Sequence, residues 1–357
     1  MSENTNTALR PKKRIWLRIL LGFLAVILGA MAVLYGYFFS KYTQVYDKAE
    51  SALPEITVEQ TYDEIVSVNE DYAAAMAAAT ANLAPKPVVE ATSDILQDKD
   101  VYNVLLIGTD ERSDYTDNAR GDTCILLSLN TSGDAPVVSL VSLERGMGVP
   151  ILRGEYAGEW DWLTHTFRYG GATLLLEEVS ECFKIEVDHY VRVNFAAFEA
   201  GIDAIGGVDV TFDEAEKQYF IDGYKLETAV VCVNHLNGKH ALNYARLREI
   251  DNDWRRIERQ REVIISAIDR CRHLSPAQIN ALVDTLLPMV KTNIPQTKIA
   301  EMLLLVPQLR YVSVQQATIP QEDTYGSMTG LGGRSMFAVD FEANTAFLKE
   351  FLYPQIK

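Results

Sequence analysis

The apolar segment at residues 15–39 constrains this 357-residue chain most, because it divides the chain into two unequal parts. It reads "IWLRILLGFLAVILGAMAVLYGYFF", and Arg18 is its one charged residue. A helix needs about 20 apolar residues to cross a bilayer, so the segment predicts a transmembrane helix. A cleavable signal peptide has a shorter apolar core and a small-x-small cleavage site. The length and the aromatic end "YGYFF" favour an uncleaved anchor instead.

The charges that flank this segment predict its orientation. Basic residues precede it, whereas the lysines that follow are mixed with acidic residues: Arg10, Lys12, Lys13 and Arg14 before, and Lys41, Asp47, Lys48 and Glu50 after. The positive-inside rule therefore places residues 1–14 in the cytoplasm and the chain after about residue 40 outside the cell membrane. A tail of this length is too short to fold, so we expect an extracytoplasmic function.

The charge balance excludes one class of function and indicates another. The formal net charge is -16, which argues against nucleic-acid binding because phosphate contacts need a broadly basic face. Yet the stretch "YARLREIDNDWRRIERQR" at 244–261 contains six arginines. A local basic cluster in an acidic protein indicates a confined anion site.

Strand and helix patterns alternate along the extracytoplasmic part. Residues 40–99 are polar and alanine-rich and predict a helical stalk. Short apolar runs at 102–108, 123–130 and 137–143 predict buried strands, and helical spacing follows them. This alternation indicates an α/β core over 100–275, with a sheet covered by helices. In residues 276–357 we expect helices and a single strand that complete the same sheet.

Two acidic groups follow or precede the predicted strands. Asp110 lies in "GTDERSD" directly after one strand, and Asp122 lies in "ARGDT" directly before the next. Ligands gather at strand ends in such sheets, and two carboxylates there could share Mg²⁺. The alternative is an ordinary solvated acidic loop. Arg145, in "SLERGMG", ends the third predicted strand.

The arginine stretch suits a pyrophosphate. Arg246 and Arg248 leave one predicted helix, and Arg256 and Arg259 open the next, whose positive dipole end adds to the attraction for anions. Arginine binds phosphate oxygens in a bidentate way and keeps its charge. The alternative is a set of surface ion pairs such as Glu249–Arg256.

Other reactive groups carry little signal. The chain has no phosphate-binding G-x-x-x-x-G-K-[ST] loop and no G-x-S-x-G elbow. His165 has no marked nucleophile beside it, so we interpret it as structural. The four cysteines form no CxxC pair, which disfavours zinc. A Cys182–Cys232 disulfide stays open.

The ordered motifs of residues 100–350 resemble those of the LytR-CpsA-Psr family. The resemblance rests on "YNVLLIGTDER", "ARGDTCILLSLN", "VSLVSLERGMGVPI", "THTFRYGGATLLLEEV", "VDHYVRVNFAAFEAGIDAIGGVDV", "LNGKHALNYARLR", "DNDWRRIERQREVI" and "VKTNI". It implies a three-layer α/β/α sandwich around a mixed sheet, with an apolar pocket for a polyprenyl tail.

The resemblance also implies an activity. Proteins of this family are membrane-anchored enzymes, mainly of Gram-positive bacteria, that transfer glycopolymers from undecaprenyl pyrophosphate to peptidoglycan, commonly at the muramic acid 6-hydroxyl. Mg²⁺ (or Mn²⁺) assists. A non-catalytic polyprenyl-pyrophosphate binding or regulatory protein is the alternative, and a simple pyrophosphatase is a third interpretation.

The resemblance assigns roles by position. Asp110 and Asp122 match the metal-associated acids, with Arg145 as the third catalytic residue, and either aspartate is a candidate general base. The residues matching the pyrophosphate-binding positions are Arg112, Arg120, Arg246, Arg248, Asp253, Arg256, Arg259 and Gln260. Arg255 stands where the family usually has a small residue.

Three positions depart from the family pattern. Gly146 replaces the acid that usually follows the arginine, as "PRD" becomes "ERG". Trp162 replaces the usual lysine, and Thr164 the usual asparagine, in "DWLTHTF". Nearby Asp161 and Arg168 are the charged residues that could compensate.

Overall fold

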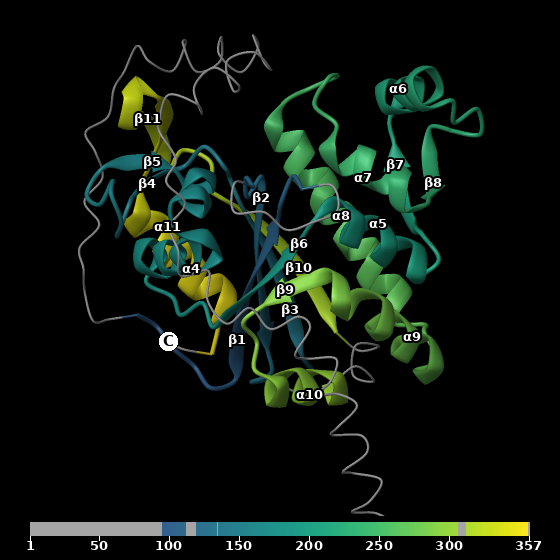
Figure 1. Cartoon of the computed structure of the whole chain (residues 1–357), viewed down its shortest axis with the longest axis horizontal. Helices are drawn as coiled ribbons and strands as arrows, with labels where there is room; N and C mark the ends of the chain where they lie inside the picture. Colours follow the sequence, from purple (N-terminus) through teal and green to yellow (C-terminus); the bar gives the residue numbers. More distant parts are fainter. Residues whose placement is uncertain (1–94, 112–118, 134, 306–311, 356–357) are drawn as a thin grey trace, which may run out of the picture. The chain divides into compact units, whose positions relative to one another are not determined.

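The computed structural model describes residues 95–111, 119–133, 135–305 and 312–355 (Figure 1). The predicted anchor at 15–39, most of the predicted stalk and Arg112 lie outside these residues. No helix in the described part is long and apolar enough to cross a membrane.

The central sheet, within the described residues, contains six strands: Val101–Gly108 (β1), Thr123–Asn130 (β2), Val137–Leu143 (β3), His189–Val193 (β6), Val290–Thr292 (β9) and Ser313–Ile319 (β10). Their order is β10-β3-β2-β1-β6-β9. The β1–β2, β2–β3 and β6–β9 pairs are antiparallel, whereas β6 runs parallel to β1 and β10 to β3. The sheet is therefore mixed, as predicted.

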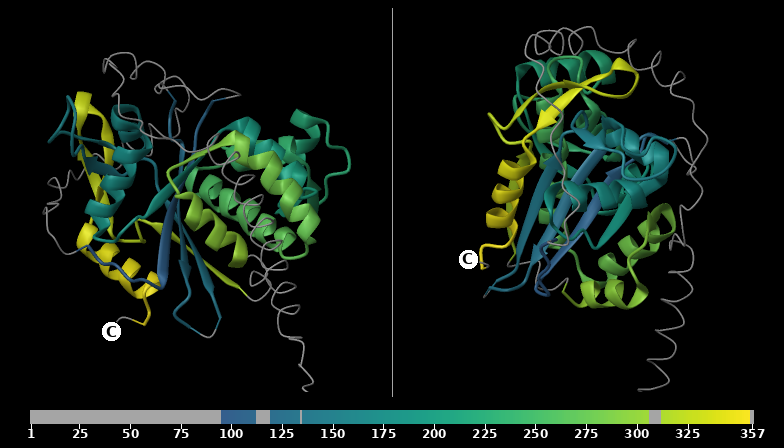
Figure 2. Two further views of the ribbon diagram at one scale, coloured as in Figure 1. Left: turned by 60° about the horizontal axis from the view of Figure 1, so that its bottom comes forward. Right: turned by 90° about the vertical axis from the view of Figure 1, so that its left-hand side faces the viewer.

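Helices cover both faces of this sheet (Figures 1 and 2). On one face, Leu105 and Leu126 join a core with Leu175 from the helix Leu163–Phe183 (α4) and Leu348 from the helix Phe341–Leu352 (α11). The other face carries Ile125 and its neighbours, which pack against the helix Asp253–Cys271 (α8). Alternate residues of β2 thus serve opposite cores, as the pleat of a strand requires.

A third core lies beside α8. The strands Val208–Phe212 (β7) and Cys232–Leu236 (β8) form an antiparallel pair. Phe212 and Phe220 bury their rings there with Tyr244. The helices around this core are Phe195–Ala204 (α5), Glu214–Tyr224 (α6), Gly238–Arg246 (α7) and Pro276–Leu286 (α9).

The prediction of a single strand in residues 276–357 was wrong. Strand β10 joins the central sheet as expected, but β9, from the same part of the chain, joins the sheet as well. Tyr325–Thr329 (β11) and Ser335–Val339 (β12) form a separate hairpin. The remaining elements are Gly148–Pro150 (β4), Trp160–Trp162 (β5), Gln296–Leu305 (α10) and the short 3-10 turns Leu287–Met289 (η1) and Leu331–Gly333 (η3). The hairpin was not predicted because its sequence, "YGSMTGLGGRSMFAV", is rich in glycine and small polar residues and lacks a clear apolar run.

All four cysteines are free. Cys182 is buried and Cys232 is exposed, so the disulfide that the sequence left open is not formed.

Candidate functional site

Four strand ends meet at one edge of the central sheet. Gly108, at the end of β1, pairs with Thr123, at the start of β2, and with Val193, at the end of β6. Cys124 of β2 pairs in turn with Leu143, the last residue of β3. This register places the segments that carry Asp110, Asp122 and Arg145 side by side, because each lies within two residues of a paired strand end.

Three of the predicted arginines converge on one aspartate. Asp253 Oδ2 lies 2.8 Å from Arg256 and 3.6 Å from Arg145 Nε, and Asp253 Oδ1 lies 3.2 Å from Arg248 Nε. Arg145 also reaches Asp122, at 3.8 Å. These five residues, Asp122, Arg145, Arg248, Asp253 and Arg256, are called the arginine cluster below.

The start of α8 holds the aspartate of the arginine cluster in place. Asn252 caps the helix by accepting a hydrogen bond from the Arg255 amide, so Asp253 occupies the first turn. The positive end of the helix stabilises a carboxylate there. The Asp253 side chain is only 7% exposed, whereas Arg145 and Arg248 are 14% and 22% exposed. The carboxylate therefore lies beneath guanidinium groups that reach solvent.

The alternative of a solvated surface ion pair does not hold for Arg256, whose side chain is 4% exposed and bonded to Asp253. It does describe Arg255, which pairs with Glu258 on the exposed face of α8. Burial lowers the pKa of Arg248, and the neighbouring charge of Arg145 lowers it further, although Asp253 and Asp122 oppose this. Positive charge is thus concentrated here.

Sequence reasoning missed Glu144, a buried acid beside the arginine cluster. Its carboxylate accepts a 2.7 Å hydrogen bond from the amide of Arg145 and a 3.4 Å one from that of Gly146. Burial, and then the charge of Asp253, raise its pKa from 4.5 to about 8. An acid that immediately continues the apolar run "VVSLVSL" was the available signal.

We expect Glu144 to make the protein less stable as the pH rises. Because its pKa is raised on folding from 4.5 to about 8, the folded state keeps a proton that the unfolded state loses. The contribution of Glu144 to the free energy of unfolding is complete below about pH 4.5 and is lost as the pH rises to about 8. Urea denaturation of Glu144→Gln against wild type checks this. The free-energy difference between the two should change over that window, and a constant difference would contradict the assignment.

Asp110 and Arg120 form a second group at the same sheet edge. Asp110 Oδ2 accepts from Arg120 Nε at 3.0 Å, and Oδ1 accepts from the Arg120 amide at 2.9 Å. Asp122 is 34% exposed. No cluster of three or more potential metal ligands occurs among the described residues. A cation held by Asp110 and Asp122 would therefore need further oxygen ligands from a bound phosphate and water, which Mg²⁺ commonly uses.

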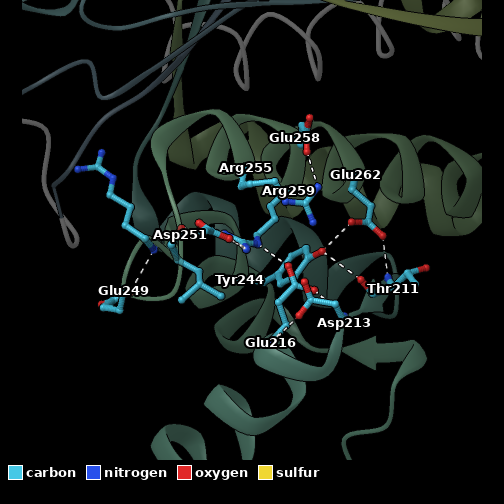
Figure 3. Close-up of polar contacts among 12 residues, drawn as sticks. Thr211, Asp213, Glu216, Tyr244, Glu249, Asp251, Arg255, Glu258, Arg259 and Glu262 are labelled. Carbon is cyan, nitrogen blue, oxygen red and sulfur yellow. Dashed lines mark hydrogen bonds and ion pairs between the residues drawn. The ribbon is translucent and has the colours of Figure 1, made fainter. Parts of the chain in front are cut away.

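The structure gives the other predicted residues different surroundings. Arg259 is 1% exposed and bonds Glu216, Asp251 and the Leu247 carbonyl (Figure 3). Gln260 donates to the carbonyl of Ala245 at 3.3 Å. Both side chains therefore hold the end of α7 and the following loop against α8. Their predicted contact with an anion is not supported by these bonds.

Arg246 is exposed and lies with its guanidinium carbon 4.4 Å from the centre of the Phe195 ring. That ring follows β6, whose end is at the same sheet edge as Asp110. Arg246 remains available to solvent on its other side. Another arginine at this edge, Arg192 on β6, was not predicted; it is buried and paired with Glu111.

Trp162 connects the arginine cluster to a buried ionic network. The guanidinium carbons of Arg145 and Arg334 each lie 5.9 Å from its ring centre. Arg334 bonds both oxygens of Asp161, at 2.5 and 2.7 Å. His165 also bonds Asp161 and stacks on Trp162, which agrees with its structural interpretation.

Burial would raise the pKa of Asp161, but hydrogen bonds and charges from His165 and Arg334 outweigh it and hold the pKa at about 2. The carboxylate is therefore ionised at neutral pH. Arg334, from the turn of the β11–β12 hairpin, supplies a cation next to Trp162. Only the tertiary fold brings residue 334 here, so no sequence spacing could have shown it.

A mixed sheet that gathers arginines and carboxylates at one edge defines an α/β protein with a candidate site for an anion. The sequence model of the LytR_cpsA_psr family matches residues 64–351, and the chain belongs to that family.

Relatives of known activity share part of the chain. The polyisoprenyl-teichoic acid–peptidoglycan teichoic acid transferase TagU of Oceanobacillus iheyensis is 31% identical over 220 residues, which are 59% of this chain and 64% of TagU. The corresponding transferase TagT of Bacillus subtilis is 32% identical over 227 residues, 62% of this chain and 68% of TagT. The chain thus spans less than two thirds of that TagU.

Solved structures share the fold. A structure of TagT bound to LIIa-WTA superposes with a TM-score of 0.58 at 26% identity, covering 76% of this chain and 98% of that one. The crystal structure of Bacillus subtilis TagV gives 0.55 at 26% identity, with 72% and 98% covered.

Proposed function

We propose that this chain is a membrane-anchored phosphotransferase that moves a glycopolymer from a polyprenyl-pyrophosphate carrier onto peptidoglycan through a phosphodiester linkage. The names of the TagU and TagT relatives support this substrate class. The proposal places residues 15–39 in the membrane with the N-terminus cytoplasmic, and the α/β domain at the wall side of the membrane.

The arginine cluster is the observation that carries the proposal. Three guanidinium groups surround Asp253, with Asp122 as the second carboxylate of the cluster. The cluster thus has one more positive than negative charge, and Glu144 adds no negative charge while it keeps its proton. A pyrophosphate could bind the outward sides of Arg145 and Arg248, since planar guanidinium groups match phosphate oxygens.

Phosphoryl transfer needs positioning and charge neutralisation more than covalent chemistry by the protein. In the proposed reaction a wall hydroxyl oxygen bonds to the glycan-bearing phosphorus while the bond from that phosphorus to the bridging oxygen breaks. Polyprenyl phosphate leaves, and the hydroxyl proton passes to a carboxylate. Arg145 and Arg248 neutralise the charge that spreads over the phosphate oxygens.

Asp110 and Asp122 are the two candidates for the general base. Both oxygens of Asp110 already accept hydrogen bonds from Arg120, whereas Asp122 is 34% exposed and faces Arg145 from 3.8 Å. Asp122 is thus the more accessible proton acceptor. Mg²⁺ or Mn²⁺, held by Asp110 and Asp122 together with phosphate oxygens, would supply further neutralisation of the phosphate charge.

A non-catalytic binding protein is the second candidate. Gly146 and Trp162, which stand where the family usually has an acid and a lysine, favour it. Glu144 and Arg334 oppose it, because they place an acid and a cation beside these two positions.

Release of polyprenyl phosphate distinguishes the candidates. We would incubate the full-length chain in detergent with a synthetic polyprenyl-pyrophosphate glycan and Mg²⁺, with and without peptidoglycan oligomers. We expect release that depends on the oligomers and falls at least about a hundredfold when EDTA removes the cation, as electrostatic stabilisation of this kind predicts. Release without the oligomers would indicate a pyrophosphatase. Tight binding without release would indicate the binding protein.

A further inference from the structure

Three aromatic side chains form a cluster beside the proposed site. Trp254 belongs to the first turn of α8, Tyr325 begins β11, and Phe337 lies in β12. The ring centres are 5.9 Å apart for Trp254 and Tyr325, 6.3 Å for Trp254 and Phe337, and 5.1 Å for Tyr325 and Phe337. We call these three residues the aromatic platform.

The aromatic platform is open to solvent. Tyr325 is 39% exposed, and it is the one aromatic residue in the described part of the chain that is exposed to this degree. Trp254 and Phe337 are half-buried. Rings that served only the core would be covered, as those of Phe183 and Phe341 are.

The aromatic platform adjoins the arginine cluster on two sides. Trp254 directly follows Asp253 in the chain, and the amide of Phe337 donates a 2.9 Å hydrogen bond to the carbonyl of Gly146, which directly follows Arg145. Arg145 and Asp253 are themselves 3.6 Å apart. The aromatic platform, of which Tyr325 is the exposed ring, is therefore joined to the arginine cluster through the chain at Trp254 and through a backbone hydrogen bond at Phe337.

We propose that the aromatic platform binds a pyranose ring of the glycan next to the transferred phosphate, an inference that rests on the proposed function. A pyranose has an apolar face of C–H bonds and a rim of hydroxyl groups. The electron-rich face of an aromatic ring attracts such weakly positive hydrogens, while the rim stays in water. A sugar bonded to the phosphate lies within a few bonds of it, which matches the position of the platform.

Two different sugars of the proposed reaction could bind the aromatic platform. One is the first sugar of the donor glycan, which is bonded to the pyrophosphate. The other is the wall sugar whose hydroxyl attacks the phosphorus. Both present the same C–H face, so the structure assigns the ligand class, and kinetics distinguish the source.

The test compares Tyr325→Ala and Trp254→Ala with Tyr325→Phe and Trp254→Phe, which keep a ring. Leu152→Ala, at a residue 38% exposed, is the matched control for loss of an exposed apolar side chain. Saturation-transfer NMR on the full-length chain in detergent uses a phosphate-free N-acetylglucosamine–N-acetylmuramic acid oligomer as the probe. We expect transfer to the sugar C–H protons in the wild type, the Phe variants and the control, and its loss in both Ala variants.

Steady-state kinetics identify the source. We expect the Ala variants to raise one KM about tenfold, the loss of roughly one ring contact, with kcat within a factor of two. A raised KM for the peptidoglycan oligomer assigns the acceptor sugar, and a raised KM for the lipid-linked glycan assigns the donor sugar. A structural role alone would instead lower the folded fraction and affect both substrates equally.

If a folded Ala variant leaves the KM for one substrate unchanged, the aromatic platform does not bind the sugar of that substrate. If neither KM changes and sugar saturation transfer persists in both Ala variants, the aromatic platform does not bind a sugar. The NMR measurement requires no turnover. An inactive wild type would therefore overturn the proposed function, whereas the NMR comparison of wild type and Ala variants would still test sugar binding at the aromatic platform.

Discussion

Replacement of Arg145 by alanine is expected to lower kcat/KM for glycopolymer transfer by roughly 10²–10³-fold, the usual effect of removing a group that stabilises transition-state charge. Arg145 lies two residues after the end of β3, contacts both Asp122 and Asp253, and is partly open to solvent. Its removal takes away one of the two guanidinium groups that the proposed function assigns to the phosphate. Initial rates of polyprenyl phosphate release, measured with saturating acceptor, check the prediction.

A matched control separates this effect from a general loss of surface charge. Arg153 is 45% exposed and pairs with Glu177 away from the arginine cluster, so Arg153→Ala should keep the wild-type rate. Arg145→Lys keeps the charge without the planar fork, and we expect an intermediate rate. A folded Arg145→Ala protein with more than a tenth of wild-type activity would remove Arg145 from the site.

Replacement of Arg259 by alanine should lower the free energy of unfolding by about 3–5 kcal/mol, because it leaves the buried Glu216 carboxylate without a counter-charge. Arg259 and Glu216 are each 1% exposed, and Asp251 is 20% exposed (Figure 3). Chemical denaturation measures this loss directly.

Arg255 provides the control on the same helix. Its pair with Glu258 is about half exposed on each side, so Arg255→Ala should change the unfolding free energy by only about 0–1 kcal/mol. Equal effects of the two replacements would contradict the division of the arginine stretch into buried, structural members and members that face the site.

Local patterns were sufficient to predict the main sheet. The apolar runs at 102–108, 123–130 and 137–143 correspond to β1, β2 and β3, because each strand is covered on both faces and is therefore mostly apolar. The β11–β12 hairpin was not predicted because its burial follows no regular alternation and its strands contain several small polar residues.

The candidate site could be predicted in part. Strand ends and a helix start indicated Asp122, Arg145 and Asp253, and the sheet register brings these together. Spacing could not distinguish Arg259 from Arg256, since both lie on one helix and differ only in what the fold places opposite them. Arg334 reaches the site through its tertiary contact with Trp162, which no local pattern encodes, whereas the apolar run that precedes Glu144 was a local signal for that residue.

Mass spectrometry of the transfer product tests the proposed phosphotransferase most directly. The full-length chain in detergent would be mixed with polyprenyl-pyrophosphate glycan, peptidoglycan oligomers and Mg²⁺, with Asp122→Ala and Arg145→Ala in parallel. The proposal predicts a glycan–peptidoglycan conjugate joined by a single phosphate in the wild type and its loss in both variants. Intact donor bound to a folded wild-type protein, with no conjugate formed, would contradict it.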